Sequence, residues 1–509
     1  MRSTFLGFNT VRSGLFAAQR ALDITGHNIA NVNTKGYTRQ RLEQVQSTPM
    51  SLPGGQGMLG TGVDTLAIKQ LRNEFLDFRY RGEVNSLGYW EAKRDGLYYL
   101  EAILNEPSDT GITTVIDELF ASFQQLSKPE NANNLSTRNL VRENAIAFTN
   151  SINHMYDQME KMVRDLNFDI VTTVNSINSY ADQIAQLNEQ IFRFEVDGGN
   201  ANDLRDQRNH LIDELSKLVN LEVVEVVDIN DTVVSSKEHV GKKMVLQING
   251  QPLVYHGTAY KLDADTKGKS DFFEDIGVDL EINTVKWANG STLNVSGLKG
   301  ELKALLDLRD GTGGNTKGVP YYIEQLNRFT QVFAEEVNKI HSSGYGLDGK
   351  TGYHFFTANG LTTTDAKMDG APQINAKNIR VSLDMDDLNK IAAASEEDLL
   401  PGDGSNALRI SKLRDDTGMF REGKPEDFLK TLISNLGVDT LEAIRNATNQ
   451  LALTEQVDIE RQRISGVSMD EELSNMVKFQ HAYNASARMI TTMDEMLDVV
   501  INRIGLVGR

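Results

Sequence analysis

At 509 residues the chain is too long for a single hydrophobic core, so about two to four domains are expected. Its composition, 39% hydrophobic and 24% charged, is that of an ordinary folded protein. A net charge of −19 argues against nucleic acid as the main partner, and the lack of cysteine excludes disulfides and thiolate metal sites.

The first 32 residues and the last 45 residues carry apolar side chains at seven-residue spacing. Each pattern predicts a helix with one narrow apolar stripe, and the simplest burial for two such stripes is against each other. We therefore expect residues 1–50 and 465–509 to form one terminal assembly domain, in which the end helices pair as a coiled coil. The predicted assembly seam is Phe8, Leu15, Leu22 and Ile29 with Met476, Tyr483, Ile490 and Leu497.

A cluster of asparagines follows the first helical pattern. Asn28, Asn31 and Asn33 lie where the helix should stop, and Gly36 and Tyr37 lead into an extended run. Asparagine bonds its own backbone and tolerates left-handed geometry, which glycine adopts more readily still. An ordinary helix end followed by a loop explains these five residues, but their density suggests a more specific role.

The middle of the chain reads as a helical frame with one β-rich insertion. Helical spacing runs through 137–219, resumes after residue 300 and returns in 427–463, and a helix over 140–192 would be roughly 80 Å long. We expect a mostly helical second domain made of residues 51–220 and 300–464. Residues 221–299 instead contain short β-branched runs and two Asn-Gly pairs, Asn249-Gly250 and Asn289-Gly290, which predict hairpin turns in a small inserted β-rich domain. The predicted fold class is thus multidomain and mainly α.

Nothing in the sequence indicates chemistry. The eight histidines have no compact metal-ligand spacing, and the glycine-rich loops at 53–62, 311–318 and 401–406 match no phosphate-binding motif. No nucleophile motif is present, so we expect no enzyme activity, cofactor or metal. Neither a secretory signal peptide nor an apolar stretch of about 18 residues is visible, so we expect a soluble protein with no membrane partner.

Four segments resemble the axial proteins of the bacterial flagellum, which are its rod, hook and hook-associated proteins. ALDITGHNIANVNTKGYTRQ, at residues 21–40, resembles the N-terminal signature of that family, and it contains Asn28, Asn31, Asn33, Gly36 and Tyr37. Residues 466–501 are similar to the matching C-terminal end. The internal segments 321–356 and 391–410 resemble hook-associated members more than the shorter rod and hook proteins.

The resemblance implies a structural protein at the junction between hook and filament, which transmits torque. It also implies a secreted, extracellular location reached by type III export. The implied partners are other copies of the chain in a helical ring, the hook protein, a second junction protein adjoining the filament, and a flagellar export chaperone. Two alternatives stay open at this point: another axial role in the hook or rod, and a surface-exposed binding or hydrolytic protein that uses the β-rich insertion.

Overall fold

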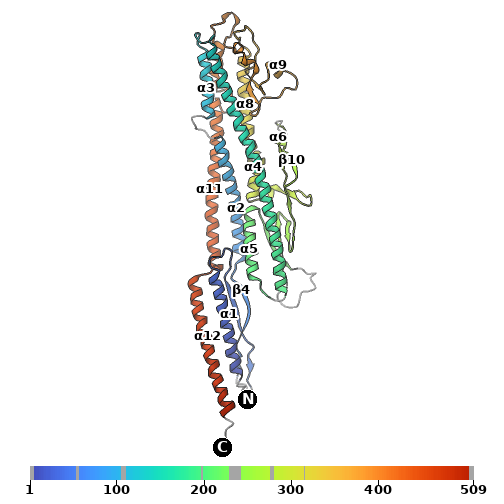
Figure 1. Ribbon diagram of the computed structural model, residues 1–509, viewed down its shortest axis with the longest axis vertical. Helices are drawn as coiled ribbons and strands as arrows, with labels where there is room; N and C mark the ends of the chain where they lie inside the picture. Colours follow the sequence, from blue (N-terminus) through green and yellow to red (C-terminus); the bar gives the residue numbers. More distant parts are fainter. Residues whose placement is uncertain are drawn as a thin grey trace.

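The computed structural model describes residues 5–52, 57–104, 111–196, 199–227, 242–275, 280–314 and 316–503. They form an elongated, mainly helical rod with both ends of the chain at the same tip (Figure 1). The helices are α1 Phe5–Ala30, α2 Glu74–Leu104, α3 Ile112–Leu126, α4 Leu135–Val196, α5 Asn202–Leu218, α6 Asp271–Asp275, α7 Glu301–Asp310, α8 Val319–His341, α9 Thr363–Ala366, α10 Ser405–Lys412, α11 Pro425–Ser465 and α12 Met469–Asp498. The strands are β1 Gln40–Gln46, β2 Met50–Ser51, β3 Met58–Leu59, β4 Val63–Gln70, β5 Glu222–Val227, β6 Lys242–Ile248, β7 Gln251–Tyr255, β8 Thr258–Ala259, β9 Leu262–Asp263, β10 Lys267–Lys269, β11 Glu281–Asn283, β12 Lys286–Trp287, β13 Thr312–Gly313, β14 Thr316–Lys317, β15 Phe356–Ala358 and β16 Ile379–Val381.

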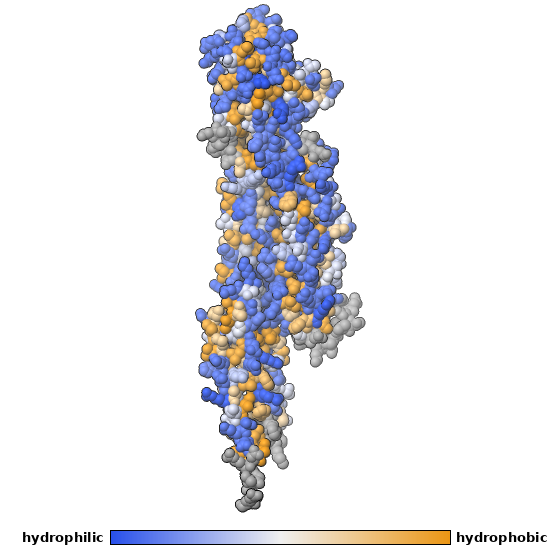
Figure 2. Space-filling model, in the orientation of Figure 1, coloured by the Kyte–Doolittle hydropathy of each residue, from blue (hydrophilic) through white to orange (hydrophobic). Residues whose placement is uncertain are grey.

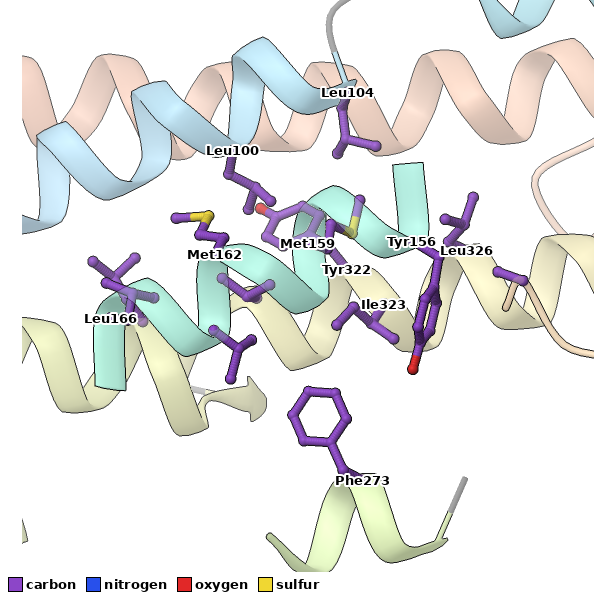
Figure 3. Packing of buried hydrophobic residues seen from close by; sticks show 14 of the residues in the cluster. Leu100, Leu104, Tyr156, Met159, Met162, Leu166, Phe273, Tyr322, Ile323 and Leu326 are labelled. Carbon is purple, nitrogen blue, oxygen red and sulfur yellow. The ribbon is translucent and has the colours of Figure 1, made fainter. Parts of the chain in front are cut away.

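The body of the rod is a helical bundle built along α4. This helix has 62 residues and is about 90 Å long at 1.5 Å per residue. Its buried side chains recur at helical spacing along nearly the whole length, so neighbours cover one face from end to end. Figure 3 shows the centre of this core, where Met159 and Met162 of α4 pack among side chains of α2 and α8.

The β-rich segment lies along α4. Strands β5 to β8 form an antiparallel four-stranded sheet, and Asn249 and Gly250, with φ of 50° and 80°, make the two-residue turn between β6 and β7. The second Asn-Gly pair makes a different turn, because only Gly290 has a positive φ, of 87°. Apolar side chains of this segment belong to the same continuous core as those of α4.

Three asparagines of α4 attach the β-rich segment to the helix. Asn178 donates to the carbonyl of Leu262 at 2.8 Å and accepts from its N–H at 2.9 Å, as a paired strand would. Asn167 accepts from the N–H of Asn283 at 2.8 Å, and Asn188 donates to the carbonyl of His256 at 3.0 Å. These bonds satisfy backbone groups that the short strands leave unpaired.

The end of the rod away from the termini contains a long irregular segment after α8, which buried polar side chains hold in place. Arg138 is fully buried and donates to the carbonyls of Ala132 and Ile391. His341 is also fully buried: its Nδ1 bonds the Tyr353 carbonyl at 2.8 Å, and its Nε2 accepts from the Ala392 N–H at 3.0 Å. Burial lowers the pKa of His341 to about 4, so the ring stays neutral.

The terminal unit, which we define as α1, the β1–β4 hairpin and α12, forms the opposite end of the rod. Strands β1 and β4 pair antiparallel from Gln40↔Gln70 to Gln46↔Val63, with a bulge between Glu43 and Gln44. Helix α1 lies between α12 and the hairpin and contacts both (Figure 1). Among the described residues, no helix is long and apolar enough to cross a membrane.

Candidate functional site: the joint between the termini and the body

Helices α1 and α12 run antiparallel in a fixed register. A Cβ atom at Gly7 would lie 2.8 Å from Met493 Cε, and one at Gly14 would lie 3.7 Å from Ser486 Oγ. Seven residues forward along α1 therefore correspond to seven residues back along α12. The same register brings Asn28 next to Glu472, two further heptads along each helix. A constant heptad register is the geometry of a two-stranded coiled coil.

The predicted seam residues are all half-buried. This holds for Phe8, Leu15, Leu22 and Ile29 of α1 and for Met476, Tyr483, Ile490 and Leu497 of α12. The most deeply buried apolar residues of α1 are instead Ala17, Ala18, Ala21 and Ile24. The predicted seam contains none of these four residues, because α1 is covered by the hairpin as well as by α12. In the sequence, small residues that recur at a spacing of three or four positions were the signal for the close contact of α1 with its neighbours.

Asn28 is the centre of a buried hydrogen-bond network and is 1% exposed. Its Nδ2 donates to the Gln40 carbonyl at 2.9 Å and to Glu472 Oε2 at 3.0 Å. Its Oδ1 accepts from the Tyr37 hydroxyl at 2.7 Å and from the Gln40 N–H at 3.0 Å. All four hydrogen-bonding positions of the amide are therefore used, and they join α1, the loop after it and α12.

The other asparagines and Gly36 shape the loop that leads from α1 to the hairpin. Asn31 donates to the His27 carbonyl at 3.0 Å and accepts from the Thr34 hydroxyl at 3.1 Å, which ends the helix. Asn33 is exposed. Gly36 has a φ of 78°, and a Cβ there would lie 3.0 Å from Cβ of His210 on α5, so both the backbone and the space favour glycine.

Tyr37 packs its ring edge-on against His27, with ring centroids 5.5 Å apart. Burial raises the pKa of Tyr37, and Asp203, Asp206 and Glu472 raise it further. The hydroxyl therefore stays protonated and can donate to Asn28.

Arg39 connects the loop to α12. Its guanidinium contacts Glu472 at 2.7 and 2.8 Å and Glu471 at 2.6 Å, while its N–H donates to the Ser465 carbonyl at the end of α11. The Glu472 side chain is 3% exposed and Glu471 is 63% exposed. Both oxygens of the buried Glu472 carboxylate are hydrogen-bonded, one by Arg39 and one by Asn28, which is the condition under which a buried charge is tolerated.

Helix α5 binds the loop from the body side. The Thr38 N–H donates to Asp206 Oδ2 at 2.9 Å, and Gln40 Nε2 donates to Asp203 Oδ1 at 2.7 Å. Burial raises the pKa of Asp206 to about 6, although Thr38 and Arg72 favour its charged form. Arg72, which follows β4, also pairs with Asp77 at 2.6 Å.

Three body helices meet beside this loop at Arg461 of α11. Its guanidinium bonds Asp213 of α5 at 2.6 Å and lies 3.9 Å from the ring centroid of Tyr80 of α2. Arg81 of α2 bonds the other oxygen of Asp213 at 2.8 Å. The loop, α2, α5 and α11 line a cleft of about 890 Å³.

The joint is a network of mutually paired charges and amides. Among the described residues, no group of three or more His, Asp or Glu side chains is placed to hold a metal ion. What this geometry provides is stiffness, because many short polar contacts between the terminal unit and the body are concentrated in it.

Sequence reasoning identified Asn28 and Tyr37 but missed the partners that give them their role. Glu472 reads as an ordinary acidic residue in the first turn of a helix, and its burial depends on Arg39, 433 positions away. Asp206 lies in the charged sequence of α5, where nothing marks it as buried. No local signal could have found either residue.

Paired terminal helices, joined to a rod-shaped helical body through a buried polar network, define an elongated assembly subunit. Residues 97–356 match the family model of the flagellar hook-associated protein FlgK helical domain. Residues 8–38 match a flagella basal body rod protein family, and residues 461–504 match the C-terminal family of flagellar basal body rod FlgEFG proteins.

Full-length relatives carry the assignment further. The chain is 34% identical to flagellar hook-associated protein 1 of Bacillus subtilis over all of both chains. It is 26% identical to the Escherichia coli protein of the same name, over 97% of this chain and 99% of that one. The flagellar hook junction protein FlgK from Burkholderia pseudomallei has the same fold, with a TM-score of 0.58 and 15% identity over 77% of this chain and 100% of that one. This chain belongs to the flagellar hook-associated protein 1 family.

Proposed function

We propose that this chain is a structural subunit of the bacterial flagellum that forms the junction between hook and filament and transmits torque. The observation that carries the proposal is the joint itself. Asn28, Tyr37 and Arg39 connect both chain ends to each other, and Thr38 and Gln40 connect them to α5 of the body. A twisting load on the terminal unit therefore reaches the body through short, paired polar contacts.

Copies of the chain assemble into a helical ring between the hook protein and a second junction protein that adjoins the filament. The half-buried seam residues of α1 and α12 support this part of the proposal, because the pairing of the two helices leaves apolar surface for neighbours. The β-rich segment 221–299 takes the outer position in the ring. Its described strands lie on the far side of α4 from α2 and α11 (Figure 1).

The subunit is secreted and reaches its extracellular place through the flagellar type III apparatus, with a dedicated chaperone on the C-terminal helix. The absence of cysteine fits a chain that is exported unfolded into an oxidising environment. Outside the ring, the exposed face of α12 would need a cover, which a chaperone can provide.

Gene deletion in the source bacterium tests the proposal. Cells without the chain should build hooks, release filament protein into the medium and fail to swim, and the wild-type gene supplied in trans should restore filaments. Filaments of normal length on the deleted cells would contradict the proposal.

A further inference from the structure

Three asparagines of the chain are followed directly by glycine, at positions 249, 289 and 359. The backbone nitrogen of such a glycine can attack the side-chain amide carbon of the asparagine, because glycine has no side chain to hinder the approach. Whether this happens in a folded protein depends on three things. They are the freedom of the amide to turn, the access of water to the glycine nitrogen, and the stabilisation of charge on the amide oxygen.

The Asn289-Gly290 pair lies in an open hairpin loop of the β-rich segment. The Gly290 N–H donates to the Trp287 carbonyl at 2.8 Å, and the Trp287 N–H donates to the Ser291 carbonyl at 3.0 Å, which leaves a loop of three residues. Asn289 and Gly290 are exposed, and a Cβ atom at Gly290 would have none of the described residues beyond its chain neighbours within 4 Å. The surface of the rod body, along which this segment lies, is mainly hydrophilic (Figure 2). Water therefore reaches both residues, and the loop has room to rearrange.

Ser291 places two hydrogen-bond donors on the Asn289 amide. Its N–H donates to Asn289 Oδ1 at 2.9 Å, and its hydroxyl donates to the same oxygen. Both donors withdraw electron density from the amide carbon, and both already lie where negative charge develops on Oδ1 when a nitrogen attacks that carbon. This is the arrangement of an oxyanion hole, here supplied by one residue.

Only a local rotation separates this loop from the reactive geometry. Gly290 has a φ of 87°, as expected for the last residue of a three-residue hairpin loop, in which the residue before it has a ψ of about 0°. At that ψ the Gly290 nitrogen is turned away from the Asn289 amide carbon. Turning the plane of the peptide between the two residues brings these atoms together and breaks one hydrogen bond, that to Trp287. Glycine takes up the opposite rotation without strain, so Ser291 keeps its place.

The fold protects the other two pairs. Asn249 is half-buried, and its amide accepts from Asn220 Nδ2 at 3.0 Å and donates to the Asn294 carbonyl at 3.1 Å, so both bonds must break before it can turn. In the third pair Gly360 is buried, and a Cβ atom there would lie 3.6 Å from the Val381 carbonyl oxygen. One pair therefore has a fixed amide, and the other has a nitrogen that is shielded from water.

We propose that Asn289 is a site of spontaneous deamidation in the folded protein, promoted by the two donors of Ser291. Hydroxide or water removes the proton of the Gly290 nitrogen, which forms a bond to the Asn289 amide carbon. The bond from that carbon to Nδ2 then breaks, and Nδ2 takes a proton from water and leaves as ammonia. Water opens the resulting succinimide ring at either carbonyl and leaves aspartate or isoaspartate at position 289. The reaction needs only water and adds a negative charge to the β-rich segment, and it does not rest on the proposed function.

Incubation of the purified full chain at mildly alkaline pH tests the proposal. Peptide mapping by mass spectrometry follows the loss of ammonia and the gain of water at each of the three pairs. The Asn289 peptide should convert at least about 10-fold faster than those of Asn249 and Asn359, because the Asn249 amide must first lose two hydrogen bonds and Gly360 is shielded. Ser291→Ala should slow the Asn289 reaction about 3- to 10-fold, whereas Ser291→Thr, which keeps the hydroxyl, should not.

Unfolding in urea is the control, because it removes the loop and leaves the sequence unchanged. In urea the three pairs should convert at similar rates, and Ser291→Ala should match the wild type. Circular dichroism checks that both serine variants fold. Equal rates at the three pairs in the folded protein would overturn the proposal, and so would an unchanged rate in folded Ser291→Ala. A preference for Asn289 that persists in urea would also contradict it, because the sequence alone would then set the rate.

Discussion

Asn28 of α1 and Glu472 of α12 lie 444 positions apart in the sequence and share a buried hydrogen bond of 3.0 Å. The same Asn28 amide bonds Tyr37 and both backbone groups of Gln40, and the same carboxylate bonds Arg39. The two ends of the chain and the loop after α1 are thus specified by one polar site. Buried polar sites of this kind fix a unique arrangement more than they add stability.

Asn28→Ala should loosen this site. It leaves the Tyr37 hydroxyl and the Gln40 N–H without their acceptor, which costs about 3 kcal/mol in the opening of the loop. Hydrogen exchange of the Gln40 amide should become roughly 100-fold faster. Asn33→Ala, at an exposed position of the same loop, is the control and should leave the rate unchanged. Unchanged protection of Gln40 in Asn28→Ala would show that Asn28 does not hold the loop.

Arg39→Leu should destabilise the terminal unit by about 3–5 kcal/mol, because Glu472 would remain buried without its cation. Adding Glu472→Gln removes that charge, keeps an acceptor for Asn28, and should recover at least half of the loss. Glu471→Gln is the matched control, since Glu471 is mostly exposed and its removal should recover little. Thermal unfolding followed by circular dichroism measures the wild type and the three variants. Equal recovery of stability by Glu472→Gln and Glu471→Gln would contradict the account.

Asp206 should make stability depend on pH in an unusual direction. Burial raises the pKa of Asp206 from 3.8 to about 6, so the folded protein binds the proton first as the pH falls. Above pH 6 the buried, charged carboxylate therefore lowers the free energy of unfolding. This destabilisation disappears as the pH falls from about 6 to 4. Across that pH range, the free energy of unfolding of the wild type should rise by up to about 3 kcal/mol relative to that of Asp206→Asn. Urea unfolding of both proteins at pH 7, 6, 5 and 4 measures the difference between their free energies of unfolding. This difference would not change with pH if Asp206 had an ordinary pKa.

His341 should act in the opposite direction. Burial lowers the pKa of His341 from 6.5 to about 4, so the unfolded chain binds the proton first. Stability contributed by the neutral ring should be lost as the pH falls from about 6.5 to 4. The glutamine of His341→Gln does not titrate. Over this pH range the free energy of unfolding of the wild type should fall by up to about 3 kcal/mol relative to that of His341→Gln. A constant difference between the two proteins would show that the ring is not held neutral.

Local patterns predicted much of the fold. The seven-spaced columns marked α1 and α12 and their pairing, and the spacing in 137–219 marked α4 and α5. The β-branched runs and Asn249-Gly250 marked the strands of the insertion. Each of these signals depends on residues close in sequence, where periodicity reports which face is buried.

The candidate site was only half predictable. Asn28 and Tyr37 stood out by residue type. Arg39 and Glu472 instead acquire their roles from each other, 433 positions apart, and Asp206 from Thr38, 168 positions away. The β1–β4 hairpin was expected only as an extended run, since its strands are separated by a long connection rather than a two-residue turn. Tertiary contacts of this kind leave no periodic trace in the sequence.

Leu22→Asp tests the central claim, that the paired terminal helices serve assembly. Leu22 is half-buried near the centre of the seam, and a carboxylate there costs several kcal/mol unless it is paired. Leu22→Met, which keeps an apolar side chain, is the control, and thermal unfolding of the body should be the same in both purified proteins. The decisive measurement is motility together with filament protein in the medium, for cells that make only the variant. We predict that Leu22→Asp cells release filament protein and do not swim, whereas normal swimming with full-length filaments would contradict the account.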